Sequence, residues 1–130
     1  MPFAKTLGVD ERLVTRSPGE VMRAMVAAFN TGETGGSGAF VHPDYVDHQG
    51  LGDERPLLGV DGFKHVVQTA RAGYSELFVT VADLIEGPDR VAARLIWTGT
   101  RPSGDAVERE GLDIVRVEAG RAIEHWGGRS

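Results

Sequence analysis

The chain has 130 residues, of which 41% are hydrophobic and 25% are charged, and its formal net charge is −5. These values predict one folded domain over residues 1–130, with residues 1–16 as an N-terminal arm. The absence of cysteine excludes disulfides, thiol nucleophiles and thiolate metal sites. No apolar run approaches the ~20 residues of a membrane span, and the N-terminus lacks a secretory pattern. Together with the acidic balance, this predicts a cytoplasmic protein that binds neither membrane nor nucleic acid.

The first helix is predicted from its end signals. Ser17 can act as the N-cap, Pro18 suits the first helical position, and Glu20 completes a capping box. Apolar residues then recur at helical spacing, and Asn30 and Gly32 end the helix. The sequence therefore predicts a helix that begins at Ser17 and has one apolar face.

A glycine-rich stretch, TGETGGSG, occupies residues 31–38. It follows a helix and lacks the GK[ST] ending of a phosphate-binding loop, so we interpret it as a plain loop. Residues 39–48 form a short apolar and aromatic segment. We expect Asp61 to be the N-cap of a second helix, one face of which carries Phe63, Val66, Val67 and Ala70.

The second half of the chain changes to the alternating pattern of strands, separated by turn residues. Helices followed by a series of hairpins are typical of an α+β fold in which the helices pack on one face of a curved antiparallel sheet. The predicted strands cover residues 77–86, 91–99, 107–117 and 121–126.

Hairpin geometry predicts partners across these strands. A turn at Pro88-Asp89 places Asp83 opposite Arg94, which favours an ion pair within the sheet. A two-residue turn at Ser103-Gly104 would also place Arg94 opposite Asp113. A loop of odd length or a bulge would instead bring Trp97 to the side of Asp113, and the sequence leaves these two arrangements open.

Several motifs in order resemble a known family. They are PDYVDHQG and GVDGFKHVV in the middle of the chain, then IEGPDRVAARLIWTGT and GLDIVRVEAGRAIEHWG. This series is similar to the SnoaL-like polyketide cyclases, which belong to the superfamily of ketosteroid isomerase and nuclear-transport-factor-like folds. The resemblance covers about residues 21–126. It implies a conical α+β fold in which a curved antiparallel sheet wraps around the N-terminal helices and leaves a single internal cavity.

The resemblance also implies chemistry and site residues. Cyclase members close a ring by intramolecular aldol chemistry without a metal or an organic cofactor. The family's acid–base aspartate matches Asp113, and its histidine near the start of the pattern matches His48. The family often has a histidine after Gly99-Thr100, where this chain has Arg101, so Arg101 joins the expected substrate-binding residues.

The residue types are consistent with such a site and leave alternatives open. Asp113 lies between Leu112 and Ile114, and a carboxylate with apolar neighbours loses hydration, which favours its use as a base; half of a structural ion pair is the alternative. His48 is either a second acid–base group or a loop histidine. As a set, the large aromatic residues suit a pocket for a flat hydrophobic or aromatic ligand, so the expected substrate-binding residues are Trp97, Trp126, Tyr45, Phe63, Arg94 and Arg101.

Three functions remain open at this stage. The first is cofactor-independent aldol-type cyclisation of a polyketide or a similar carbonyl compound. The second is an epoxide hydrolase or an isomerase on the same fold, which an Asp83–Arg94–Asp113 line across three strands would favour. The third is a non-catalytic binding or dimerisation module. The four histidines show no metal-ligand spacing, so no metal site is predicted.

A homodimer is expected from the pattern of the central strands. Residues 91–99 and 107–117 carry apolar side chains on both faces, whereas a sheet with one solvated face would alternate more cleanly. Because the helices cover one face, a second copy is expected to cover the other.

Overall fold

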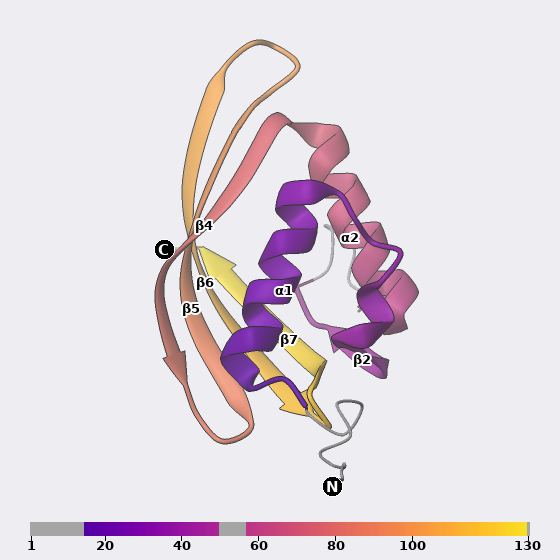
Figure 1. Ribbon diagram of the computed structural model, residues 1–130. Helices are drawn as coiled ribbons and strands as arrows, with labels where there is room; N and C mark the ends of the chain where they lie inside the picture. The colour runs from indigo at the N-terminus through magenta and orange to yellow at the C-terminus, as the bar shows by residue number, and fades with distance from the viewer. Residues whose placement is uncertain (1–14, 50–56, 130) are drawn as a thin grey trace, which may run out of the picture.

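The computed structural model describes residues 15–49 and 57–129, and the predicted arm at 1–16 lies almost wholly outside them. A curved six-stranded sheet packs against two helices, which lie together on its concave side (Figure 1). This arrangement is the expected α+β architecture. Neither described helix is long and apolar enough to cross a membrane.

Helix α1 (Pro18–Thr31) forms where its end signals predict it. The Ser17 side chain accepts a hydrogen bond from the backbone N–H of Glu20, and the Glu20 carboxylate accepts one from the N–H of Ser17, so the capping box is complete. The helix ends at Gly32, whose φ of 78° lies in the left-handed region that glycine tolerates. The glycine-rich loop beyond it contains a short 3₁₀ turn, η2 (Ser37–Ala39).

Helix α2 (Gly59–Gly73) begins two residues before the predicted N-cap. Its N-cap position is Leu58, which makes no side-chain capping bond, and Asp61 lies within the first turn. The prediction of Asp61 as the cap was therefore wrong, although an acidic side chain there still favours the positive end of the helix dipole. Phe63 and Val67 are buried against the core, as the apolar periodicity predicted.

The segment at 39–48 contributes a further strand that the hairpin pattern did not reveal. Strand β2 (Val41–Asp47) pairs in parallel with the C-terminal strand β7 (Arg121–Arg129) and antiparallel with the short β3 (Leu57–Leu58). The sheet order is β3-β2-β7-β6-β5-β4, so the sheet is mixed and not wholly antiparallel as expected.

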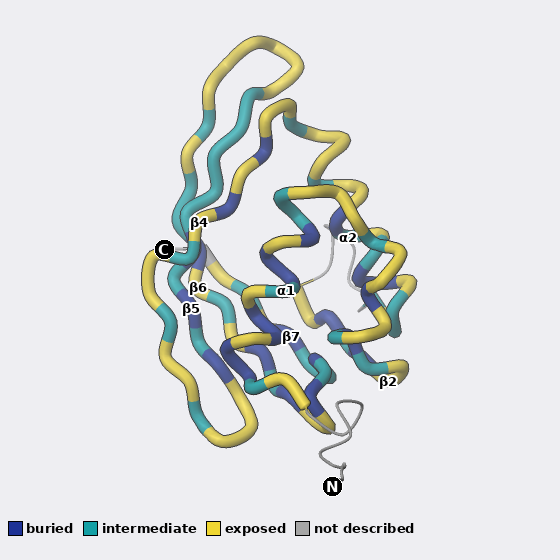
Figure 2. Tube along the Cα trace, in the orientation of Figure 1, coloured by how far each residue is buried: buried dark blue, intermediate teal, exposed yellow. Residues whose placement is uncertain are grey.

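The remaining strands form the predicted antiparallel meander: β4 (Ser75–Glu86), β5 (Arg90–Thr100), β6 (Ala106–Glu118) and then β7. The tight turn between β6 and β7 is made by Ala119 and Gly120, both with positive φ, which matches the right-handed twist of the flanking strands. Figure 2 shows buried positions recurring along these strands and along α1.

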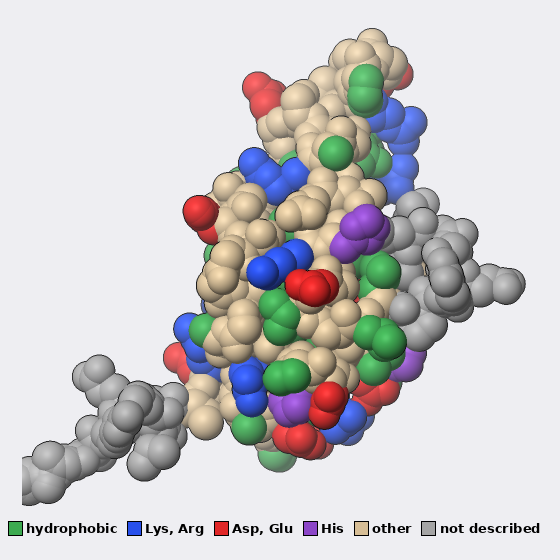
Figure 3. Space-filling view, turned by 90° about the vertical axis from the view of Figure 1, so that its right-hand side faces the viewer, with side chains coloured by type: hydrophobic (Ala, Val, Ile, Leu, Met, Phe, Trp, Pro, Cys, Tyr) green, Lys and Arg blue, Asp and Glu red, His purple; other side chains and the backbone are tan. Residues whose placement is uncertain are grey.

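The core lies between the sheet and the helices. Its fully buried residues include Val21 on α1, Phe63 on α2 and Tyr45, Val79 and Val115 on the sheet. Seen from the side of α2, the surface of the molecule mixes acidic, basic and apolar side chains (Figure 3).

Candidate active site

A cavity of about 230 Å³ opens between the concave face of the sheet and the two helices. This volume lies just below the ~300–1,000 Å³ typical of sites for drug-sized ligands, so the cavity suits a compact ligand or one part of a larger one. Its walls are mainly apolar and include Met25, Phe29, Phe63, Leu77, Leu95 and Trp97. Its polar side chains include Asp47, Gln49, Asp113 and His125.

Strand register turns Asp113 toward this cavity. The loop between β5 and β6 covers residues 101–105, and beyond it Asp113 pairs with Ala93 while Arg94 pairs with Leu112. Of the two arrangements that the sequence left open, the two-residue turn that would set Arg94 opposite Asp113 is not observed. The alternative with an odd loop is the one observed, because Trp97 and Asp113 lie on the same face of the sheet. The Asp113 side chain is 12% exposed.

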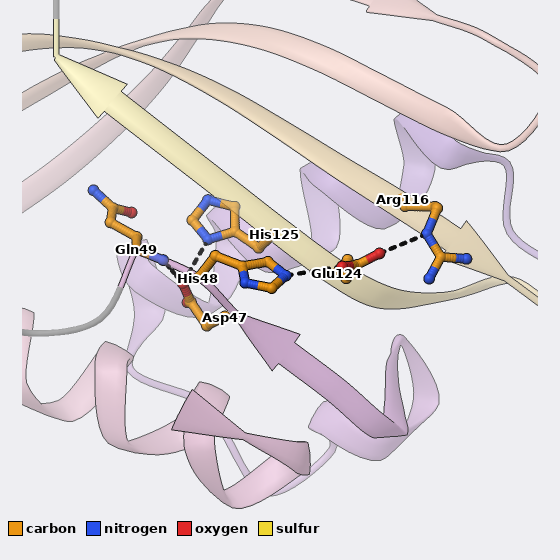
Figure 4. Close-up of polar contacts among 6 residues, drawn as sticks. All are labelled: Asp47, His48, Gln49, Arg116, Glu124 and His125. Atoms are coloured by element: carbon orange, nitrogen blue, oxygen red, sulfur yellow. Dashed lines mark hydrogen bonds and ion pairs between the residues drawn. The ribbon is translucent and has the colours of Figure 1, made fainter. Parts of the chain in front are cut away.

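His125 lies between two carboxylates. Its Nε2 is 3.3 Å from Oδ2 of Asp113, and its Nδ1 is 3.0 Å from Oδ1 of Asp47. The parallel pairing of β2 with β7 sets Asp47 and His125 directly beside each other (Figure 4). The Tyr45 hydroxyl donates to Oδ2 of Asp47 at 3.1 Å, and the backbone N–H of Gln49 donates to Oδ1 at 3.0 Å. Asp47 is therefore held on both oxygens and positions the imidazole.

The charges of this array stabilise one another. Burial alone would lower the pKa of His125, but hydrogen bonds to Asp113 and Asp47 and the two negative charges raise it to about 9. Burial would raise the pKa of Asp47, yet the hydrogen bond and charge of His125 hold it below its usual value. Burial and the neighbouring Asp47 raise the pKa of Tyr45, which stays a neutral donor. At neutral pH the array therefore contains an imidazolium between two carboxylates.

The register of β7 decides which side chains belong to the cavity. Val117 pairs with Ala122, but Arg116 pairs with Glu124, so Ile123 is an extra residue on β7. This irregularity turns His125 toward the cavity and Trp126 to the opposite face. The hairpin without it would have placed Trp126 opposite Asp113.

His48 and Trp126, both expected at the site, therefore lie outside the cavity lining. Their rings stack on each other, with centroids 5.2 Å apart and planes 14° apart. The His48 Nε2 is 2.8 Å from the Glu124 carboxylate, which also accepts a hydrogen bond from Arg116 (Figure 4). These contacts lower the pKa of Glu124, and they give His48 a structural partner on the convex face.

Arg94 and Arg101 also lie outside the cavity lining. Arg94 pairs with Asp83 at 2.8 Å, as the first hairpin predicted, and with Glu110 at 3.1 Å. This cluster is on the convex face, so the predicted Asp83–Arg94–Asp113 line was wrong in its last member. Arg101 is exposed in the loop between β5 and β6. Of the expected substrate-binding residues, Trp97, Tyr45 and Phe63 line the cavity.

Sequence reasoning missed Asp47, Gln49 and His125. The motif IEHW contained His125, but the alternation of strand residues could not assign its face without knowledge of the extra residue at Ile123. Asp47 reaches the site through a parallel strand pair whose members are far apart in the chain. Within residues 15–49 and 57–129, no cluster of three or more acidic or histidine side chains is arranged to hold a metal ion.

Comparisons with known proteins agree with this fold. IdmH from Streptomyces antibioticus, a candidate polyketide cyclase, is 28% identical, with a TM-score of 0.74 over 85% of this chain and 90% of that chain. A loop-truncation variant of IdmH gives 30% identity and a TM-score of 0.73 over 85% and 91% of the two chains. A candidate polyketide cyclase from Bacillus cereus is 27% identical, with a TM-score of 0.75 over 85% and 72%.

A SnoaL-like polyketide cyclase from Agrobacterium tumefaciens shares the fold at 18% identity, with a TM-score of 0.77 over 89% of this chain and 93% of that chain. No curated protein sequence matches the chain significantly. The sequence model of the SnoaL-like polyketide cyclase family matches residues 19–128, which is most of the chain. With this match, and with its two helices packed on a curved sheet, this chain belongs to the SnoaL-like polyketide cyclase family.

Proposed function

We propose that this protein is a cofactor-independent cyclase that closes a ring in a small hydrophobic carbonyl compound by an aldol-type reaction. Asp113 removes a proton from the carbon next to one carbonyl, and the electron pair of that C–H bond forms an enolate. The enolate carbon attacks a second carbonyl of the same molecule, which forms the new C–C bond and an alkoxide. Asp113 then returns its proton to the alkoxide oxygen, so the enzyme ends in its starting state.

The observation that carries this proposal is the placement of Asp113. Its carboxylate lies on the inner face of the sheet, at a cavity with mainly apolar walls, and its charged contact there is with His125. A partly desolvated carboxylate at the wall of such a cavity can reach the α-proton of a bound carbonyl compound. The apolar walls would accept the rings or chain of the substrate.

Asp47 and His125 have a supporting role in this proposal. The imidazolium contacts Oδ2 of Asp113, so it orients the carboxylate and leaves Oδ1 to face the space over Gly111 and Gly127. Asp47 in turn holds the imidazole through Nδ1. A base whose second oxygen is anchored in this way loses little freedom when it reacts.

The epoxide hydrolase alternative loses the geometry that favoured it. The arginine between two carboxylates is on the convex face, where the side chains of Arg94 and Glu110 are 39% and 38% exposed. A water activated there would lie outside the cavity. A binding protein without catalysis is the remaining alternative, and the following experiment separates it from a cyclase.

The proposed proton abstraction can be measured without the natural substrate. The probe is 2-tetralone, a compact bicyclic ketone, and the readout is the rate at which its α-protons exchange with D₂O, followed by NMR. We expect the protein to accelerate this exchange above the buffer rate and Asp113→Asn to reduce the acceleration by ~10²–10⁴. Asp83→Asn is the matched control, since it changes an aspartate of the convex face and should retain the wild-type rate.

Exchange at the buffer rate, or equal rates for the wild type and Asp113→Asn, would contradict the proposal. Circular dichroism and urea unfolding of both variants show whether a lost rate comes from a lost fold. Binding of 2-tetralone with no Asp113-dependent exchange would identify a binding protein instead.

We also propose that two copies associate through the convex faces of their sheets. Apolar side chains of this face are exposed on three strands: Phe78, Ile85, Leu112, Ile114 and Trp126. Exposed apolar patches of this kind are typical of interaction sites, and the helices leave this face uncovered. Analytical ultracentrifugation at micromolar concentration should show twice the monomer mass, and a monomer at all concentrations would contradict the proposal.

A further inference from the structure

A gap in the side chains of the cavity floor lies at Gly111. This residue pairs with Leu95 on β5, so its missing side chain would point into the cavity beside Trp97 and Asp113. A Cβ atom built there would be 3.7 Å from Nε1 of Trp97 and 3.9 Å from Oδ1 of Asp113. The indole nitrogen and the carboxylate oxygen therefore border the same small space.

The indole of Trp97 presents a hydrogen-bond donor to this space. Its N–H can only donate, and it makes no hydrogen bond to another residue within 15–49 and 57–129. This nitrogen is not among the buried polar atoms that lack a partner, so it is accessible from the cavity and can donate to a ligand oxygen there. The Phe29 ring packs edge-to-face on the indole at 5.0 Å, which limits the movement of the donor.

The side-chain amide of Gln49 is another polar group close to Asp113, near Gly127. Its Oε1 would be 2.5 Å from a Cβ at Gly127, and Oδ1 of Asp113 would be 3.1 Å from the same point. Gln49 is exposed, however, whereas Trp97 is half-buried and packed by an aromatic neighbour. A fixed donor stabilises developing charge better than a mobile one, because it needs no reorganisation during the reaction.

We propose that the space over Gly111 is an oxygen subsite, in which the Trp97 indole N–H binds the carbonyl oxygen of a flat bicyclic ketone whose α-proton Asp113 removes. This inference rests on the proposed function and names the ligand group that the site recognises. As the proton moves to Asp113, the C–H electron pair becomes part of the enolate and the negative charge develops on the oxygen. The indole N–H donates to that oxygen, and glycine at position 111 leaves room for it.

Binding of two flat bicyclic probes tests the subsite directly. The first, 2-naphthol, has the shape of the enol of 2-tetralone, and the second, naphthalene, lacks the oxygen. In titration calorimetry or fluorescence we expect the wild type to prefer 2-naphthol. Trp97→Phe should weaken 2-naphthol binding about tenfold and change naphthalene binding less than twofold, since it keeps an aromatic ring and removes the donor.

Gly111→Ala tests the same space without removing any hydrogen-bonding group. Its methyl would make ordinary contacts of 3.5 Å or more, so the fold should tolerate it, yet it would occupy the place of the ligand oxygen. We expect it to weaken 2-naphthol binding at least as much as Trp97→Phe. Gly128→Ala is the matched control, because Gly128 pairs with the outward-facing Leu112 and its Cβ would contact nothing within 4 Å.

The exchange of 2-tetralone provides an independent measurement. Trp97→Phe should slow the Asp113-dependent rate by about 100-fold, the lower end of the range for removal of one oxyanion donor. If the wild type exchanges protons through Asp113 but Trp97→Phe and Gly111→Ala match it in rate and in the preference for 2-naphthol, the subsite is refuted and the proposed function stands. If the wild type does not exchange protons faster than buffer, the proposed function fails. The preference of the wild type for 2-naphthol over naphthalene, and its loss in Trp97→Phe and Gly111→Ala, then decides the subsite.

Discussion

The buried imidazolium between Asp47 and Asp113 predicts a loss of stability at alkaline pH. The pKa of His125 rises from 6.5 to about 9 in the folded protein, because the hydrogen bonds and charges of the two aspartates outweigh its burial. A group with a raised folded pKa contributes its full stability below pH 6.5 and loses it as the pH rises toward 9. At 1.36 kcal/mol per pKa unit, the difference corresponds to about 3 kcal/mol.

The assay is urea unfolding at several pH values between 6 and 9.5, together with NMR titration of the imidazole. The free energy of unfolding should fall by about 3 kcal/mol between pH 6.5 and 9. Above pH 9 the contribution of His125 should no longer change. Asp47→Asn should shift the fall to lower pH, because it removes the negative charge 3.0 Å from Nδ1. His65→Gln is the matched control, since His65 is exposed on α2 and its loss should leave the pH profile unchanged.

An unfolding free energy that stays constant from pH 6.5 to 9 would refute this reasoning. So would a His125 resonance that titrates below pH 7 in the folded wild type. Either result would mean that the imidazole is neutral at pH 7 and that the two carboxylates are not held by a positive charge.

Three further predictions concern other parts of the fold. Asp113→Asn should lower the urea midpoint at pH 7 modestly, because it removes one of the two carboxylates that stabilise the imidazolium while Asp47 continues to hold His125; a variant that unfolds readily but keeps its rate per folded molecule would contradict the role of the base. Ser17→Ala should lower the free energy of unfolding by about 1 kcal/mol through loss of the α1 cap, measured by urea unfolding. Ile114→Lys should give monomers in ultracentrifugation without a change in circular dichroism, since Ile114 is 43% exposed on the convex face.

Local patterns were sufficient for the elements whose ends depend on near neighbours. Ser17 and Glu20 satisfy backbone groups within one turn, so the start of α1 could be predicted from a few residues. The pairing of Asp83 with Arg94 was equally accessible, because a short turn connects their strands. Helix α2 has no such side-chain cap, and its start at Gly59 was missed for that reason.

The facing of strand residues depends on single extra residues that the alternation does not reveal. The loop at 101–105 separated Arg94 from Asp113, and the extra residue Ile123 turned His125 inward and Trp126 outward. Because side chains alternate with a period of two, a shift of one residue exchanges the inner and outer sets. The residue types in the motif were therefore informative, whereas the face of the sheet on which each side chain lies could not be assigned from them.

The sequence by itself determined the family, the α+β class, the helices and the candidate base Asp113. Only the tertiary structure decided that Asp47, His125 and Asp113 form one array, because these residues come from three strands and one of the strand pairs is parallel and distant in the chain. The energy of such an array comes from charges that meet only after the sheet has formed. Its members could not be identified from any local stretch of the sequence.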